Sequence, residues 1–260
     1  MNWLEALVLG ILQGLTEFLP VSSSGHLEIG KALLGVEIEE NLTFDIVVHA
    51  ATVCSTLVVF RKDIGQLLAG LFKFKLNTET LYVGKLLFSA IPVIIVGLLF
   101  EDTVEGFFSG SLLLVGVMLL VTAVLLAFTY YARQREKQIS FLDAFIIGIA
   151  QAIAVLPGMS RSGATIATAL LLKNRKEEAA RFSFLMVLLP ILGKVGVDLL
   201  KGELLSEQVS ILPLLTGFIS AFVVGLLACS LMISIVKRSK LIYFALYCAI
   251  VAVLTIIFSL

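Results

Sequence analysis

The residues best suited to chemistry lie in a short polar motif that occurs twice within apolar sequence. Residues 13–26 read QGLTEFLPVSSSGH, and residues 151–165 read QAIAVLPGMSRSGAT. The first copy supplies the carboxylate of Glu17 and the imidazole of His26, and the second supplies the guanidinium of Arg161. Ionisable side chains are costly inside a membrane, and those that occur there are mostly functional. The two motifs therefore indicate where the site lies.

The serines of both copies predict helix N-termini that would bind an anion. Ser22, Ser23 and Ser24 are N-cap candidates for a helix through about residue 36, and Ser160 or Ser162 for one through about residue 173. Free N–H groups at helix N-termini attract phosphate, and arginine matches phosphate oxygens bidentately. We predict a site for a multiply charged anion beside Arg161. The residues expected to bind it are Gln13, Ser22, Ser24, Gly25, Ser160, Ser162, Gly163 and Thr165.

Glu17 and His26 add acid–base groups to this anion site. Gln13 and Glu17 are four residues apart and so share one face of the preceding helix. A carboxylate beside an anion is explained if it binds a cation such as Mg²⁺, or if it orients a base. A histidine–carboxylate pair beside serine hydroxyls is an arrangement that activates a nucleophile or a water molecule.

Structural roles are the alternative for several of these groups. Arg161 and Glu17 would then pair only to satisfy two buried charges, and His26 would cap a helix or pack at an interface. His49 lies within an apolar stretch, where we expect an interhelical hydrogen bond instead of a catalytic role. Lys31 and Glu28 are expected to pair along one helix face.

The composition predicts a membrane protein. Of 260 residues, 59% are hydrophobic and 15% charged, with a mean hydropathy of +1.07, whereas soluble domains are nearer one half and one quarter. Net charge is zero, and since no basic patch with interleaved aromatic residues occurs, no nucleic-acid partner is expected. No basic region precedes Lys31, so no cleavable signal peptide is expected. Spans of about bilayer length are predicted at 43–60, 82–100, 111–131, 182–200, 211–236 and 240–259.

The chain also repeats itself. With an offset of 138 positions, residues 4–25 match residues 142–163 at Gln13 and Gln151, at Ser22 and Ser160, and at several apolar positions. We interpret residues 1–260 as one integral membrane domain with homologous halves at 1–132 and 139–260.

Loop charge predicts the orientation of the two halves. The loops at 61–75, 133–137 and 237–240 are basic, whereas those at 101–105 and 203–207 are acidic, and an excess of Lys and Arg marks the cytoplasmic side. Residues 1–42 would then start and end outside, and residues 139–181 inside. The expected fold is all-α, an inverted repeat of six transmembrane helices plus two re-entrant helical hairpins whose tips meet near the midplane.

The two motifs resemble those of one family, the undecaprenyl-diphosphate phosphatases of the bacitracin-resistance type. The first family pattern is (Glu/Gln)-x-x-x-Glu followed by Phe-Leu-Pro-Val-Ser-Ser-(Ser/Thr)-Gly-His, and the second is Pro-Gly-x-Ser-Arg-Ser-Gly-Ala-Thr, here Pro157 to Thr165. The resemblance implies hydrolysis of undecaprenyl (C55) diphosphate to undecaprenyl phosphate and inorganic phosphate. That reaction recycles the lipid carrier for peptidoglycan synthesis and gives bacitracin resistance. It also implies a multi-pass protein of the bacterial inner membrane, with an outward-facing pocket and a divalent cation, Mg²⁺ or Ca²⁺.

The resemblance assigns roles residue by residue. It implies catalytic roles for Glu17, Ser23, His26 and Arg161, with Glu17 and Gln13 as metal ligands. Gln13 stands in the first acidic position, so it can offer a carbonyl oxygen to a metal but cannot act as a base. The nucleophile stays open between Ser23, His26 and water. A homodimer is compatible with the sequence, and an inverted-repeat transporter or flippase for a phospholipid-like or anionic substrate is the alternative function.

Overall fold

A computed structural model describes residues 1–36, 42–100, 106–107, 111–132, 137–193, 210–237 and 241–259. All of the regular structure in these ranges is helical. The acidic loops at 101–105 and 203–207 lie outside the described residues, as do most of the basic loops at 133–137 and 237–240. The predicted span at 182–200 is described only as far as residue 193.

Within the described ranges, four helices are long and apolar enough to cross a membrane. They are α5 (Thr78–Leu99), α7 (Leu112–Phe128) with its extension η2 (Thr129–Tyr131), α12 (Ile211–Lys237) and α13 (Leu241–Ser259). A bent pair, α3 (Leu42–Val59) and α4 (Arg61–Leu71), makes a fifth if counted as one span, with a bend of 73° at the break. The chain is therefore a multi-pass membrane protein. The expectation of a loop at 61–75 is wrong, because residues 61–71 form a short amphipathic helix.

Two helix–turn–helix pairs carry the repeated motifs. The first is α1 (Trp3–Thr16) with α2 (Ser23–Leu34), and the second is α8 (Phe141–Ile153) with α9 (Arg161–Leu171). Each pair begins with a capping box, formed by Asn2 with Glu5 and by Ser140 with Asp143. The second helix of each pair is capped by the predicted serine, Ser22 or Ser160.

The pairs pack against long helices through small residues. α1 packs mainly on α12, and α8 mainly on α5. A methyl group on Gly10 would lie 2.1 Å from Ser220 Oγ, and one on Gly148 would lie 2.3 Å from the Ser89 carbonyl oxygen. Such close backbone approach is typical of helix packing in membranes, where glycine at the interface permits it.

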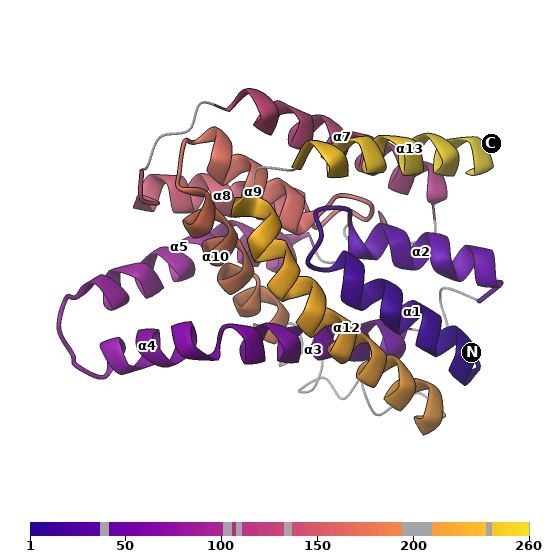
Figure 1. The fold of residues 1–260 in the computed structure, drawn as a ribbon, viewed down its shortest axis with the longest axis horizontal. Coiled ribbons are helices and arrows are strands. Elements are labelled where there is room, and N and C mark those ends of the chain that lie inside the picture. The colour runs from indigo at the N-terminus through magenta and orange to yellow at the C-terminus, as the bar shows by residue number, and fades with distance from the viewer. Residues whose placement is uncertain are drawn as a thin grey trace.

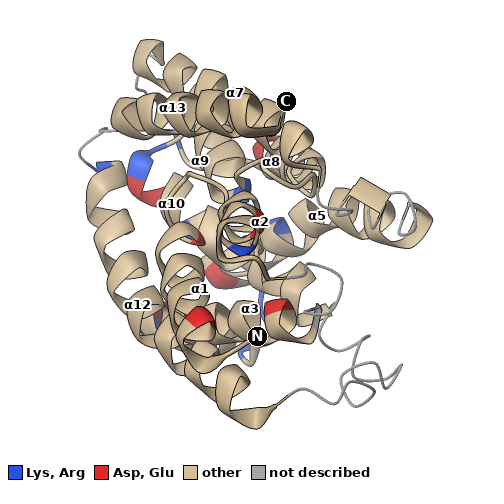
Figure 2. Cartoon of the chain, turned by 90° about the vertical axis from the view of Figure 1, so that its right-hand side faces the viewer, with Lys and Arg blue, Asp and Glu red and all other residues tan. Residues whose placement is uncertain are grey.

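The remaining helices enclose these pairs. α7 packs along α13, and α10 (Lys176–Met186) contacts α9 and α12. In Figure 1 the α1–α2 pair lies at the right, close to the N-terminus, with its turn directed toward the centre of the molecule. Figure 2 shows that α7, α12 and α13 are almost free of charged residues along their length, while charged residues gather around the helices between them. This distribution suits lipid outside and a polar site inside.

The charged pairing on α2 differs from the expectation. The Lys31 ammonium is buried and donates to Asp45 Oδ2 on α3 at 2.6 Å, instead of pairing with Glu28. Both Glu28 carboxylate oxygens are buried and have no hydrogen-bond partner within the described residues. The prediction that Lys31 pairs directly with Glu28 is therefore wrong, because Asp45 on α3 lies within reach of the Lys31 ammonium and accepts its hydrogen bond.

Candidate active site

The turns of the two helix pairs touch directly. Ser162 Oγ donates to the Leu19 carbonyl at 3.1 Å, so the start of α9 is bonded to the turn after α1. A methyl group on Gly25 would lie only 2.9 Å from Gly158 Cα, and Gly158 has a φ of +87° that favours glycine. Glycine at these two positions therefore permits the repeated motifs to form one continuous site.

Glu17 is the centre of this site. Its carboxylate, which is 10% exposed, follows the last turn of α1 and accepts hydrogen bonds from Gln13 Nε2 at 2.9 Å and from Ser23 Oγ at 2.5 Å. Arg161 Nη2 lies 3.9 Å from Oε1, and His49 Nε2 lies 3.8 Å from Oε2. The structure thus brings together Gln13, Glu17, Ser23 and Arg161, and adds His49 from α3.

The backbone at Ser22 allows Ser23 to reach Glu17. Ser22 has φ 71° and ψ 99°, in the left-handed half of backbone space where only glycine is at ease. Its Oγ accepts from the Gly25 N–H at 3.2 Å and lies 3.4 Å from Ser24 Oγ. Strained residues of this kind persist where the surrounding structure fixes them and cluster at functional sites. Here the strain accompanies the reversal of the chain between α1 and α2.

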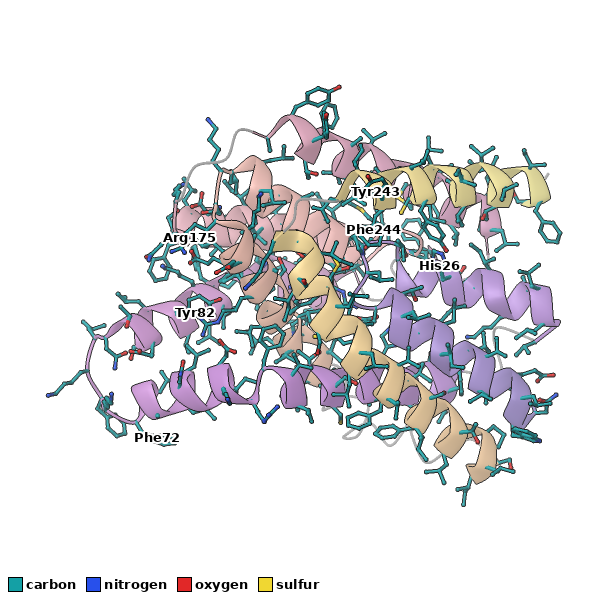
Figure 3. The ribbon with its side chains drawn as sticks, in the orientation of Figure 1. His26, Phe72, Tyr82, Arg175, Tyr243 and Phe244 are labelled. Atoms are coloured by element: carbon teal, nitrogen blue, oxygen red, sulfur yellow. The ribbon has the colours of Figure 1, made fainter. Side chains whose placement is uncertain are left out.

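His26 does not pair with Glu17, and that expectation is wrong. Its Nδ1 lies 2.8 Å from the Ser22 carbonyl oxygen, and its Nε2 lies 2.8 Å from the hydroxyl of Tyr247 on α13. Because a carbonyl only accepts, Nδ1 carries the proton, and in the neutral ring Nε2 accepts from the Tyr247 hydroxyl. The two rings stack with centroids 5.6 Å apart. Figure 3 shows His26 between α2 and α13.

In the second motif, serine caps the helix α9, and the guanidinium of Arg161 is left available to bind a ligand. Ser160 Oγ accepts from the Gly163 N–H at 3.0 Å and lies 3.3 Å from Ser162 Oγ, while the Ser160 N–H donates to Thr122 Oγ1 at 3.0 Å. The Thr165 hydroxyl donates to the Arg161 carbonyl at 2.9 Å. Within the described residues, the Arg161 guanidinium has its 3.9 Å contact with Glu17 and no hydrogen bond.

A narrow cleft, partly open to solvent, lies beside Glu17 and Arg161. Of the predicted residues, Glu17, Arg161, Ser162 and Thr165 line it. The predicted residues that do not line it are Gln13, Ser22, Ser23, Ser24, Gly25, His26, Ser160 and Gly163, although Ser23 and Gln13 reach it through their hydrogen bonds to Glu17. Its other walls come from α3 and α10, which sequence reasoning did not place in the site. The residues supplied by these walls and the adjoining turns are Phe18, Thr52, Val53, Thr56, Ser183, Phe184, Val187 and Ile191. In the sequence, the hydroxyl residues within otherwise apolar spans were the feature that could have indicated these walls.

The residues predicted to hold a metal offer oxygen atoms only. Gln13 Oε1 is buried and has no hydrogen-bond partner in the described part of the chain, and the Glu17 carboxylate lies beside the same side chain. Oxygen donors suit Mg²⁺ and Ca²⁺. No group of three or more His, Cys, Asp or Glu residues suited to a metal occurs among the described residues. The two side chains therefore fit a hard cation that takes its other ligands from phosphate or water.

Known proteins resemble this chain over its full length. The family model described as bacitracin resistance protein BacA matches residues 6–254. A Bacteroides fragilis protein named undecaprenyl-diphosphatase is 60% identical over 263 aligned positions, covering 100% of this chain and 99% of that protein. Proteins of the same name from Parabacteroides distasonis and Methanosphaera stadtmanae are 61% and 39% identical, each with 98% of both chains covered. The chain belongs to the BacA bacitracin resistance family.

Proposed function

We propose that this protein is an undecaprenyl-diphosphatase, which hydrolyses undecaprenyl diphosphate to undecaprenyl phosphate and inorganic phosphate. The observation that carries the proposal is the hydrogen bond from Ser23 to Glu17 beside the Arg161 guanidinium, which forms no hydrogen bond with the described residues. A nucleophile, a base and a phosphate-binding cation thus meet at one point of a membrane protein. The names of relatives at 56–61% identity agree with this chemistry.

The reaction follows from the roles of these three side chains. Arg161 and the N-termini of α2 and α9 hold the phosphates and offset charge as the anhydride breaks. Glu17 accepts the proton of the attacking oxygen, which belongs to Ser23 or to a water molecule in its place. That oxygen bonds to the terminal phosphorus, and the bridging oxygen leaves with the prenyl monophosphate. If Ser23 attacks, water then cleaves the phosphoserine and releases inorganic phosphate.

His26 supports this site by holding the peptide next to the nucleophile. Its Nδ1–H donates to the Ser22 carbonyl, which belongs to the peptide bond between Ser22 and Ser23. The bond from Tyr247 fixes the other side of the ring. His26 is thus a positioning residue in this arrangement, although the family resemblance alone implied proton transfer.

A divalent cation, Mg²⁺ or Ca²⁺, belongs to the proposal. The Glu17 carboxylate and Gln13 Oε1 would hold it, because the second of these oxygens is buried without a partner. When bound, such an ion would neutralise charge on the phosphates. Gln13 donates to Glu17 through Nε2, so its side-chain amide would have to rotate for Oε1 to share a cation with the carboxylate.

The proposed architecture is an inverted repeat of six spans and two re-entrant hairpins, with halves at 1–132 and 139–260. Two observations support it. The capping residues Asn2 and Ser140, and likewise Ser22 and Ser160, are 138 positions apart. The hairpin of each half packs on a long helix of the other half, with α1 on α12 and α8 on α5. We place the protein in the bacterial inner membrane with its pocket facing outward, as the family resemblance implies.

Phosphate release from a polyprenyl diphosphate by purified protein tests the function. Wild-type protein should release phosphate, EDTA should reduce the rate, and Arg161→Ala should abolish it. Arg175→Ala is the matched control, since Arg175 lies at the start of α10 outside the cleft, and it should keep the wild-type rate. Hydrolysis that survives Arg161→Ala would refute the site. Lipid transfer across liposomes without hydrolysis would instead support the transporter.

A further inference from the structure

The Ser183 hydroxyl differs from the other hydroxyls of the cleft. Thr52, Thr56 and Thr165 donate to carbonyl oxygens of their own helices at 2.8, 3.0 and 2.9 Å. Ser183, on α10, is 4% exposed, and its Oγ has no hydrogen-bond partner within the described residues although it lines the same cleft. A buried hydroxyl left unpaired costs free energy that a bound partner would recover. Ser183 is therefore available to a ligand.

Arg161 faces the same space. Its guanidinium lines the cleft, and its nearest charged neighbour, Glu17, is 3.9 Å away, beyond hydrogen-bond distance. Guanidinium groups only donate, and a serine hydroxyl can donate as well. A buried hydroxyl and a guanidinium without a hydrogen bond from the described residues line one cleft, and together they favour an anionic ligand with several acceptor oxygens.

The cleft becomes apolar beyond Ser183, at the end of α10 and in the residues that follow it. Phe184, Val187 and Ile191 line it on this side, and Phe18 and Val53 line it from the neighbouring elements. Ser183 therefore stands where the polar and the apolar linings meet. A ligand with a phosphate at Arg161 and a hydrocarbon chain along Phe184 and Val187 would match this distribution.

We propose that Ser183 binds the inner phosphate of the lipid diphosphate, the one esterified to the prenyl chain. This inference rests on the proposed function, in which Glu17 and Ser23 act on the terminal phosphate. In this assignment, Ser183 on α10 contacts the part of the substrate that leaves as prenyl monophosphate. Ser183 should therefore contact the lipid product as well as the substrate, and should not contact inorganic phosphate.

Binding of the two products to Ser183→Ala tests the assignment. Farnesyl monophosphate serves as a short lipid product and inorganic phosphate as the other, and each is measured by direct titration and as an inhibitor of hydrolysis. We expect farnesyl monophosphate to bind roughly tenfold more weakly, the loss typical of a hydrogen bond to a charged group. The affinity for inorganic phosphate should be unchanged, and KM should rise with little change in kcat.

Ser230→Ala is the matched control, because Ser230 is exposed on α12 and donates to its own helix at 2.9 Å. It should leave both affinities unchanged. Ser183→Cys, which keeps the volume but donates poorly, should reproduce the loss if the alanine variant folds badly. Unchanged binding of farnesyl monophosphate would overturn the proposal, and so would an equal loss for inorganic phosphate. Wild-type protein that binds farnesyl monophosphate but hydrolyses no diphosphate would refute the proposed function alone.

Discussion

The Ser23 hydroxyl donates a hydrogen bond to the Glu17 carboxylate across the turn that joins α1 to α2, over 2.5 Å. This bond links the end of one half-helix to the start of the next. It also sets a nucleophile against a base before any substrate enters. Because the carboxylate also faces Arg161 and His49, its charge is balanced while it stays 10% exposed.

Glu17→Gln should remove the base and keep the shape of the site. The amide can still bond to Gln13 and Ser23, so the fold should be retained, but it cannot accept a proton. We expect kcat to fall by roughly 10²–10⁴ in phosphate-release assays. Glu17→Asp keeps the charge on a shorter side chain and should retain more activity than the glutamine variant. A Glu17→Gln enzyme with more than a tenth of the wild-type kcat would exclude Glu17 as the base.

Ser23→Ala distinguishes attack by serine from attack by water. If Ser23 attacks, rapid quench of a single turnover should trap a phosphoserine in the wild type, and alanine should abolish both the trapped species and turnover. Ser230→Ala is the control, since Ser230 is exposed on α12 and donates to the Leu226 carbonyl of its own helix at 2.9 Å. No trapped species, together with residual turnover by Ser23→Ala, would assign the attack to water.

Local features of the site could be predicted from the sequence. Ser22 and Ser160 were expected to cap α2 and α9 because capping depends on a few adjacent residues. The contact between Gln13 and Glu17 follows from their spacing on one helix face.

The contacts that were missed join segments far apart in the chain. His26 meets Tyr247, 221 positions away, and His49 reaches Glu17 only because α3 packs against α1. No local pattern specifies such packing. The helix at 61–71 was mistaken for a loop because Arg61, Lys62 and Asp63 at its start resemble a charged connection.

Substitutions at Lys31 and at Glu28 should change the stability of the protein in opposite directions, although the two residues lie one turn apart on α2. Lys31 is buried and paired with Asp45, whose side chain is 35% exposed, so Lys31→Met leaves a partly solvated carboxylate without its partner and should cost about 1 kcal/mol of stability. The Glu28 carboxylate is buried and accepts no hydrogen bond from the described residues, so Glu28→Leu removes a buried polar group and should be neutral or stabilising. Thermal unfolding in detergent measures both. A large loss of stability in Glu28→Leu would contradict this expectation and show that the carboxyl group stabilises the fold.

Gly148→Ala tests the close packing of α8 on α5. The added methyl group would lie 2.3 Å from the Ser89 carbonyl oxygen, so the helices must separate. We expect a loss of about 1–3 kcal/mol in unfolding free energy, which outweighs the higher helix propensity of alanine. Gly97→Ala on α5 is the control, since nothing lies within 4 Å of its added methyl group, and it should be neutral or stabilising. Equal stability of the two variants would contradict the packing.

Tyr247→Phe should separate positioning by His26 from direct proton transfer. The variant keeps the stacked ring but removes the hydroxyl that occupies His26 Nε2, so that the bond from Nδ1 to Ser22 and the ring stacking continue to hold the imidazole. We expect about 1 kcal/mol lower stability, a kcat reduced only a few-fold and an unchanged KM, because neither residue lines the cleft. Tyr243→Phe, an exposed position one turn earlier on α13, should behave as wild type. A fall in kcat as large as that of Glu17→Gln would instead place the His26–Tyr247 pair on the path of the proton.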